Sequence, residues 1–212
     1  MFQANCYICA PDGKTAYLID VGMDAADTAR QAVADAGLEV AAVIATHGHI
    51  DHTAEAAELA DEYAVPLWIH SADRMMLSDP GSWLNPLAAA QTVPMLKRPM
   101  VEPERLLFYD QDAELAKGLP FAWTHAPGHS PGSVLLAMPY GGEGFSHIVF
   151  TGDVVFAGSV GRTDIPGGDK DVMRATLDGP VRELPAESVL LPGHGPQTTL
   201  ARELAANPYL RR

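Results

Sequence analysis

The chain has 212 residues and a net charge of −13, with a pI of about 4.8. Apolar residues make up 47% and charged residues 19%, which is typical of a globular protein, and the length suits one domain covering residues 1–212. So acidic a surface repels phosphate backbones, which argues against a nucleic-acid partner. No apolar stretch approaches the ~20 residues of a membrane span, and the start, MFQANCYICAPDGK, does not resemble a secretory signal. We therefore expect a cytoplasmic protein without a membrane partner.

The first third of the chain alternates between strand-like and helix-like patterns. The expected strands are NCYICA (5–10), TAYLID (15–20), VAAVIA (40–45) and PLWIH (66–70), and the expected helices cover 24–37 and 53–64. Asp24 is the predicted N-cap of the first helix, and Gly37 is predicted to end it. This alternation favours a layered α/β domain.

The only cysteines are Cys6 and Cys9, in NCYIC. A CxxC pair can indicate redox chemistry or zinc binding, but residues three apart on a strand point to opposite faces. Two thiols on opposite faces cannot share one ion, so we interpret both as packed core thiols.

Residues 78–104 interrupt the alternation and contain five prolines. A loop of this length is uncommon in a compact domain and is often functional, for instance as a lid; the alternative is an ordinary proline-rich excursion over the core. Further strands are expected at LLFYD (106–110), FAWTHA (121–126), SVLLAM (133–138), HIVFTGD (147–153) and SVLLPGH (188–194), with two helices in the last third.

Metal-capable side chains follow several of these strands. THGHIDH at 46–52 holds three histidines and an aspartate, and the later strands lead to His129, Asp153 and His194. Open α/β sheets form their sites outside the strand ends, so these loops are expected to converge. The candidates are His47, His49, Asp51, His52, His129, Asp153 and His194. One ion needs three or four ligands, whereas seven suffice for two ions that share a carboxylate.

Nitrogen and oxygen ligands of this kind suit zinc, iron or manganese. Three other histidines, His70, His125 and His147, lie at strand ends, where a hydrogen-bond partner is the simplest explanation. We assign none of them to the metal.

The motifs THGHIDH, PGHSPGS, TGD (151–153) and GHG (193–195) resemble the metallo-β-lactamase superfold. Within it, GSVGRTD (158–164) and LPGHGPQTTLARELAANPYL (191–210) resemble the short bacterial branch of the glyoxalase II-type hydroxyacylglutathione hydrolases. The resemblance covers almost the whole chain. It implies an α/β fold, an αββα sandwich of two mixed β-sheets flanked by helices, with the metals at one edge.

The resemblance also implies roles for individual residues. His47, His49 and His129 would hold one ion, Asp51, His52 and His194 would hold the other, and Asp153 would bridge them. Asp51 and Asp153 are thereby also the candidate catalytic carboxylates. Asp20 either orients a metal ligand or is only a turn aspartate before Gly22.

The implied activity is hydrolysis of S-D-lactoylglutathione or a related 2-hydroxyacyl thioester by a hydroxide shared between two divalent ions, zinc first, with iron or manganese as alternatives. The main competitor is a persulfide dioxygenase with a single iron on His47, His129 and Asp153. Zinc β-lactamases typically have cysteine at the position of Asp153 and are exported, and processing nucleases of the superfold usually carry basic surfaces. A relative without chemistry usually loses several ligands, and here all seven are present.

The thiol carrier is where the chain departs from the family. A lysine and a tyrosine that contact glutathione in glyoxalase II are Arg162 and Asp164 here, and a further tyrosine is Pro196. Arg162 either pairs with a substrate carboxylate or pairs with Asp164 and stiffens its loop. Family members also usually have about ten residues before NCY that form a first strand, so this strand is expected to be missing or replaced. The oligomeric state cannot be predicted.

Overall fold

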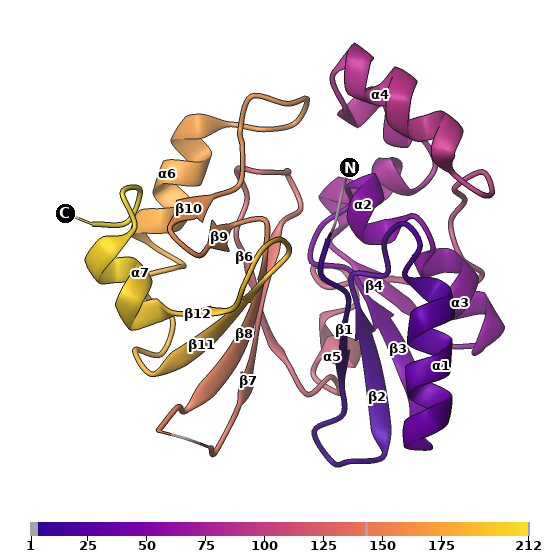
Figure 1. The fold of residues 1–212 in the computed structure, drawn as a ribbon, viewed down its shortest axis with the longest axis horizontal. Helices are drawn as coiled ribbons and strands as arrows, with labels where there is room; N and C mark the ends of the chain where they lie inside the picture. Colours follow the sequence, from indigo (N-terminus) through magenta and orange to yellow (C-terminus); the bar gives the residue numbers. More distant parts are fainter. Residues whose placement is uncertain (1–3, 143, 212) are drawn as a thin grey trace.

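The computed structural model describes residues 4–142 and 144–211 (Figure 1). Its strands are β1 (Tyr7–Cys9), β2 (Thr15–Ile19), β3 (Glu39–Ile44), β4 (Leu67–Ile69), β5 (Leu106–Phe108), β6 (Ala122–His125), β7 (Val134–Pro139), β8 (His147–Gly152), β9 (Val155–Phe156), β10 (Ser159–Val160), β11 (Ser188–Pro192) and β12 (Thr198–Thr199). Its α-helices are α1 (Ala26–Ala36), α2 (Ile50–Thr53), α3 (Ala56–Glu62), α4 (Pro86–Thr92), α5 (Ala113–Ala116), α6 (Lys170–Asp178) and α7 (Leu200–Ala206). Three 3-10 helices are η1 (Ser71–Leu77), η2 (Pro80–Trp83) and η3 (Val93–Met95).

Two five-stranded mixed sheets form the centre of the fold. The first has the order β1-β2-β3-β4-β5, in which β1 and β2 are antiparallel and the other neighbours are parallel. The second has the order β12-β11-β8-β7-β6. In the second sheet β6 and β8 are each antiparallel to β7, and β11 is parallel to β8. Strands β6, β8 and β11 therefore run in the same direction, and their C-terminal ends share one edge.

The apolar core has three layers, which explains how the helices attach. Buried residues of α1 and α3, such as Val33 and Leu59, pack against the outer face of the first sheet. Met173 and Leu177 of α6 pack with β7, β8 and β11 of the second sheet. Between the sheets lies a cluster that includes Ile44, Trp68, Leu136 and Phe150. The result is an αββα sandwich, as predicted, with helices on both outer faces (Figure 1).

The start of the first helix was predicted incorrectly. Ala25 and not Asp24 is the N-cap, and no side chain of the cap residue hydrogen-bonds to the helix. The backbone N–H of Ala26 instead donates to the buried carboxylate of Glu55, 2.8 Å away. Asp24 pairs with Lys97 on the surface. The predicted end of the helix is confirmed, because Gly37 is its C-cap.

Two other boundaries also differ from the prediction. Of the helix expected at 53–64, only Ala56–Glu62 forms α3, and the short helix α2 (Ile50–Thr53), which was not expected, precedes it. The backbone of Glu55 leaves the helical conformation between the two helices. The segment 78–104, expected to be a loop, contains η2, α4 and η3. Pro86 supplies the first turn of α4, and the side chain of Asn85 accepts from the N–H of Ala88, which is a favourable helix start. The prediction of a loop rested on the length of the segment and its prolines and did not consider this cap.

The two thiols lie on opposite sides of the first sheet, as expected. Cys6 packs against the cluster under α1 and α3, whereas Cys9 packs against the cluster between the sheets. The strand expected to be missing or replaced falls partly on residues 1–3, outside the described residues; among those described, β1 is the edge strand.

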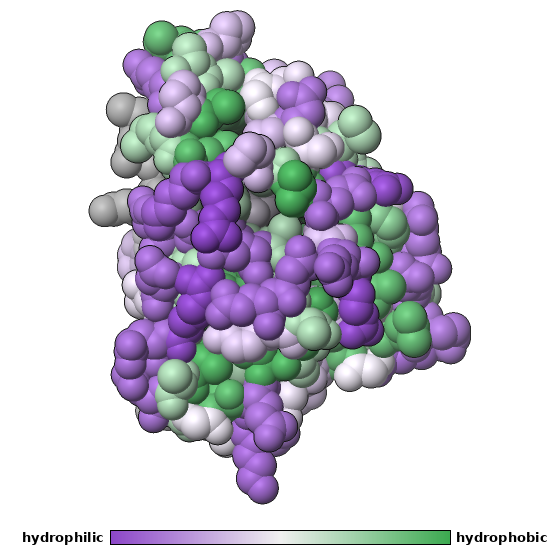
Figure 2. All heavy atoms as spheres, turned by 90° about the vertical axis from the view of Figure 1, so that its right-hand side faces the viewer, coloured by the Kyte–Doolittle hydropathy of each residue, from purple (hydrophilic) through white to green (hydrophobic). Residues whose placement is uncertain are grey.

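The face that carries α1 and α3 is mostly hydrophilic (Figure 2). On it the guanidinium of Arg30 pairs with Asp27 and Glu62 at 2.7 and 2.8 Å. A search of the described residues finds no helix with both the length and the apolar character that a membrane crossing requires.

Candidate metal centre

The predicted ligands come from four loops at one edge of the sandwich. The loop after β3 carries His47 and His49 and continues into α2, which holds Asp51 and His52. The remaining three follow the second sheet: His129 follows β6, Asp153 follows β8 and His194 follows β11. Because β6, β8 and β11 end at the same edge, their loops meet the loop from β3 there. The structure brings all seven predicted side chains together.

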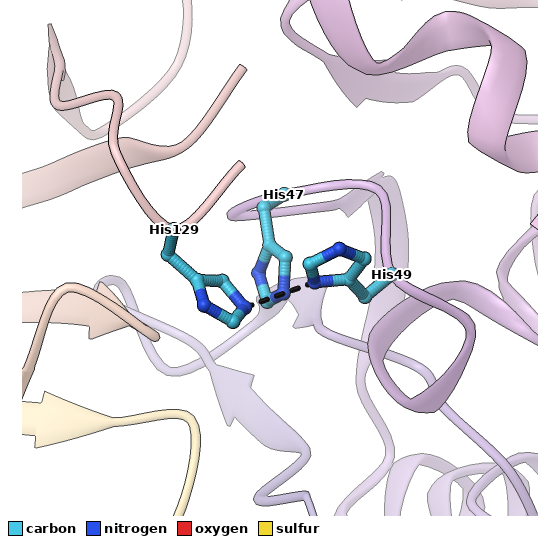
Figure 3. Close-up of side chains that lie close together, drawn as sticks. All are labelled: His47, His49 and His129. Atoms are coloured by element: carbon cyan, nitrogen blue, oxygen red, sulfur yellow. Dashed lines mark hydrogen bonds between the residues drawn. The ribbon is translucent and has the colours of Figure 1, made fainter. Parts of the chain in front are cut away.

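The first group contains His47, His49 and His129 (Figure 3). All three are buried, and Nδ1 of His49 lies 2.9 Å from Nε2 of His129. The carbonyl oxygen of Arg162 lies 2.8 Å from Nδ1 of His129. A carbonyl can only accept, so this Nδ1 carries the proton and Nε2 of His129 presents a lone pair to the group.

The second group contains Asp51, His52 and His194. A carboxylate oxygen of Asp51 lies 3.3 Å from Nε2 of His194, and the Nε2 atoms of His52 and His194 are 3.4 Å apart. Asp153 lies between the two groups. Its Oδ1 is 3.4 Å from Nε2 of His52, and its Oδ2 is 3.4 Å from Nε2 of His129. One carboxylate therefore faces both groups, and its Oδ2 also lies 3.6 Å from Nε2 of His194.

The polar atoms at this centre are poorly satisfied by the protein itself. Of the five buried side-chain atoms without a hydrogen-bond partner among the described residues, three lie here: Nε2 of His47, Nε2 of His49 and Oδ1 of Asp153. Buried polar atoms normally have partners, and a cluster of exceptions is typical of side chains that bind a cation. The side chains fit a dinuclear metal site.

The ionisation of the first group and of Asp153 also suits cations. Burial lowers the pKa of His47 well below its usual range and that of His49 to about 3, so both rings are neutral at pH 7 and keep a lone pair. Burial by itself would raise the pKa of Asp153, but His52 and other histidines nearby lower it, so its carboxylate is charged.

Asp20 lies beneath the second group, and its carboxylate contacts both ends of the THGHIDH segment. Its Oδ1 accepts from the N–H of Thr46, and its Oδ2 lies 3.0 Å from Nδ1 of His52. We therefore favour the interpretation in which Asp20 orients a ligand over that of a simple turn aspartate.

The other three histidines are not part of the cluster. The rings of His70 and His125 stack at 4.2 Å, Nδ1 of His70 accepts from the N–H of Ala72, and Nε2 of His125 donates to the carbonyl of Pro131. Nδ1 of His147 lies 3.0 Å from the hydroxyl of Ser146. All three have hydrogen-bond partners, as expected.

A pocket of about 360 Å³ opens onto the two groups. Besides the predicted ligands, its walls include Leu84, Asn85, Ala88, Phe156, Ser159, Val160, Arg162 and Ile165. The segment 78–104 thus forms part of the wall, through Leu84 and Asn85 between η2 and α4 and through Ala88 of α4. Sequence reasoning did not identify Leu84, Ala88 or Phe156; the available signal was that apolar residues lie within the Pro-rich segment and shortly after the TGD motif.

The side chain of Arg162 is already engaged. Its guanidinium forms two hydrogen bonds to the carboxylate of Asp164, at 2.8 and 2.9 Å. This pair is the second of the two roles considered for Arg162, and both of its side chains are exposed.

Comparison with known proteins agrees with the fold and the cluster. The family model of the metallo-beta-lactamase superfamily matches residues 1–194. The chain belongs to this superfamily. The chain is 36% identical to an uncharacterized protein of Mycobacterium tuberculosis, over 99% of this chain and 94% of that one. It is 31% identical to the hydroxyacylglutathione hydrolase GloC of Haemophilus influenzae, over 99% and 93% of the two chains.

Solved structures extend the comparison. The crystal structure of the B3 metallo-beta-lactamase BLEG-1 superposes with a TM-score of 0.78 at 31% identity, covering 99% of this chain and 95% of that one. A crystal structure of TTHA1623 in a di-iron-bound form gives a TM-score of 0.76 at 33% identity, covering 99% and 96%. These proteins are similar to this superfamily member in sequence as well as in fold.

Proposed function

We propose that this protein is a metal-dependent thioester hydrolase that converts S-D-lactoylglutathione, or a related 2-hydroxyacyl thioester, into the acid and the free thiol. The observation that carries the proposal is the position of Asp153 between two complete groups of ligands. A site for one ion needs only one group. The similarity to a hydroxyacylglutathione hydrolase over 99% of the chain supports the thioester as the substrate class.

Two divalent cations held by these side chains would lower the pKa of a bound water to near neutrality and would polarise the carbonyl of the substrate. In the hydrolysis, the oxygen of water bonds to the carbonyl carbon and the C–S bond breaks. The thiol, with a pKa of ~8.5, leaves as a thiolate and needs no strong general acid. No serine or cysteine lies among the seven cluster residues, consistent with attack by water.

The side chains around the centre orient the ligands and shape the pocket. The carbonyl of Arg162 and the carboxylate of Asp20 each hold one ring nitrogen of a histidine, so that the other nitrogen faces the cluster. Leu84, Ala88 and Phe156 line the pocket beside the cluster. Apolar walls limit the access of bulk water and strengthen electrostatic interactions inside.

Zinc is the proposed metal, with iron or manganese as alternatives, because five imidazoles and two carboxylates suit all three. The di-iron form of the similar TTHA1623 favours testing iron alongside zinc. We propose two ions per chain, and a stoichiometry of one would contradict the dinuclear assignment.

The thiol half of the substrate is proposed to contribute little. Arg162 is occupied by Asp164, and the family's glutathione-contacting tyrosines correspond to Asp164 and Pro196. A charged contact of this kind is worth ~1–3 kcal/mol, or ~10–100-fold in affinity. D-lactoylglutathione should therefore be hydrolysed with a high KM, and the lactoyl thioester of a small simple thiol should be nearly as good a substrate.

The test compares kcat/KM for these two thioesters on zinc-loaded protein, at one pH and salt concentration. A ratio below ~100-fold, equivalent to ~2.7 kcal/mol, is expected. A larger preference for the glutathione conjugate would show that the pocket recognises glutathione specifically.

Two competing activities are measured on the protein as purified, after its metal content has been determined. Oxygen consumption with glutathione persulfide, together with one tightly bound iron, would assign the protein as a persulfide dioxygenase instead. Because BLEG-1 is a B3 metallo-beta-lactamase, a chromogenic cephalosporin is tested as well. Turnover of the cephalosporin with no thioester hydrolysis would overturn the proposal.

A further inference from the structure

A buried carboxylate outside the cluster connects the two loops that carry its first group. Asp73, in η1, has 0% of its surface exposed. Its Oδ2 accepts from the N–H of Gly48 at 2.8 Å and from the hydroxyl of Ser130 at 2.6 Å. Its Oδ1 accepts from the N–H of Gly132 at 2.6 Å. Three donors from two loops therefore converge on one side chain.

Both loops are shaped to let this carboxylate in. A Cβ atom on Gly48 would lie 2.9 Å from Cβ of Asp73, and one on Gly132 would lie 2.6 Å from its Cγ. Contacts this short do not occur between real side chains, so any residue larger than glycine would force the loops away from Asp73. Gly48 in THGH and Gly132 in PGHSPG are therefore needed for the close approach of Asp73, a requirement that metal binding alone does not explain.

The hydrogen-bonded backbone groups are adjacent to the predicted ligands. Gly48 lies between His47 and His49, and Ser130 directly follows His129. Among the described residues, the Asp73 carboxylate accepts no hydrogen bond from Asp51, His52 or His194. Its hydrogen bonds lie beside residues of the first group, whereas Asp20 contacts His52 of the second.

We propose that Asp73 is a positioning residue that sets the spacing between the loop of His47 and His49 and the loop of His129, and so determines the affinity of the first metal ion. The inference rests on the metal centre of the proposed function but not on its substrate. A carboxylate that holds both loops preorganises the three imidazoles, because the loops do not have to be drawn together when the ion binds.

The alternative is that Asp73 only stabilises the fold, and the chain contains a matched control for it. Glu203, 1% exposed, also accepts three hydrogen bonds: from the N–H of Gly158, the hydroxyl of Thr198 and the amide of Asn207. None of these three partners carries or adjoins a cluster side chain. Asp73→Asn and Glu203→Gln therefore make the same chemical change in similar surroundings. Only Asp73 is hydrogen-bonded to the loops that carry the ligands.

The experiment measures zinc release from the zinc-loaded protein to a chromophoric chelator, which yields one constant for each ion. Asp51→Ala, which removes a residue of the second group, identifies which constant belongs to which group. In Asp73→Asn, the amide NH₂ must face a donor on one side, because an amide has only one acceptor oxygen. We expect a ~10–100-fold loss of affinity for the first ion and no comparable change for the second. Glu203→Gln should leave both constants close to those of the wild type.

Ser130→Ala keeps the proposal testable if Asp73→Asn does not fold. It removes one of the three donors and should lower the affinity for the first ion by a smaller factor than Asp73→Asn does. Wild-type affinity for the first ion in either variant would overturn the positioning role, and so would an equal loss in Glu203→Gln. A wild-type protein that holds two zinc ions without hydrolysing thioesters would refute only the proposed substrate, because release of the two ions is measured without substrate.

Discussion

The carboxylate of Asp20 lies 3.0 Å from Nδ1 of His52, and both side chains are buried. The same carboxylate accepts from the N–H and the hydroxyl of Thr46, at 2.8 Å each. Asp20 therefore joins the end of β2 to the loop after β3 and turns Nε2 of His52 toward Asp153 and His194.

Replacing Asp20 by asparagine should weaken metal binding at the second group. Asp20 has a φ of 57°, which asparagine tolerates well, so the backbone should be preserved while the negative charge behind His52 is lost. We expect a ~10–100-fold loss of zinc affinity at that group, with a similar fall in kcat. Zinc content by mass spectrometry and steady-state kinetics check this; wild-type values for both would show that Asp20 is only a turn residue.

Asp153→Ala should lose zinc from both groups and nearly all activity, because Asp153 faces His52 with one oxygen and His129 with the other. The matched control is His70→Ala, which removes a histidine that stacks on His125 away from the cluster and should keep two ions. Equal zinc loss in the two variants would mean that the proposed ligand set is wrong.

Arg162→Ala should change the KM for D-lactoylglutathione by less than ~10-fold, because its guanidinium is held by Asp164. The pair is exposed, so its loss should leave the free energy of unfolding almost unchanged. Initial-rate kinetics give the KM, and urea denaturation gives the free energy of unfolding. A larger rise in KM that Arg162→Lys partly reverses would instead indicate direct recognition of the substrate by this charge.

The free energy of unfolding should decrease in alkaline solution partly because of the thiols. Burial raises the pKa of Cys6 from 9.0 to about 12 and that of Cys9 to about 11. The unfolded chain therefore loses these protons first, so their contribution to stability is complete below pH 9 and is lost as the pH rises toward 12. Denaturation of the wild type and Cys6→Ala between pH 7 and 11 should show a shallower decline in the variant. Identical slopes would contradict the burial of a neutral thiol.

A layered α/β domain and the seven candidate ligands could be predicted from local patterns in the sequence, whereas the αββα sandwich was implied by the resemblance to the superfold. Buried strands appear as short apolar runs such as VAAVIA, and a ligand that follows a strand directly, as His47 follows β3 and Asp153 follows β8, must lie at the sheet edge. Helix boundaries were less predictable. Asp24 has the side chain of an N-cap, but Glu55, from a distant part of the chain, supplies the acceptor to Ala26.

Only the tertiary structure could reveal Asp73 and settle which partner Arg162 contacts. In the sequence, Asp73 is one acidic residue among 27, and Gly48 and Gly132 lie 25 and 59 residues away from it. No local pattern connects such positions, because their contact depends on how β4 and η1 lie between the loops that follow β3 and β6. Likewise, the exposed arginine of GRTD could have reached a substrate or its own loop, and the backbone geometry of residues 162–164 selects Asp164. Local composition determines which side chains are capable of binding a metal, whereas long-range packing determines which other side chains hold them in place.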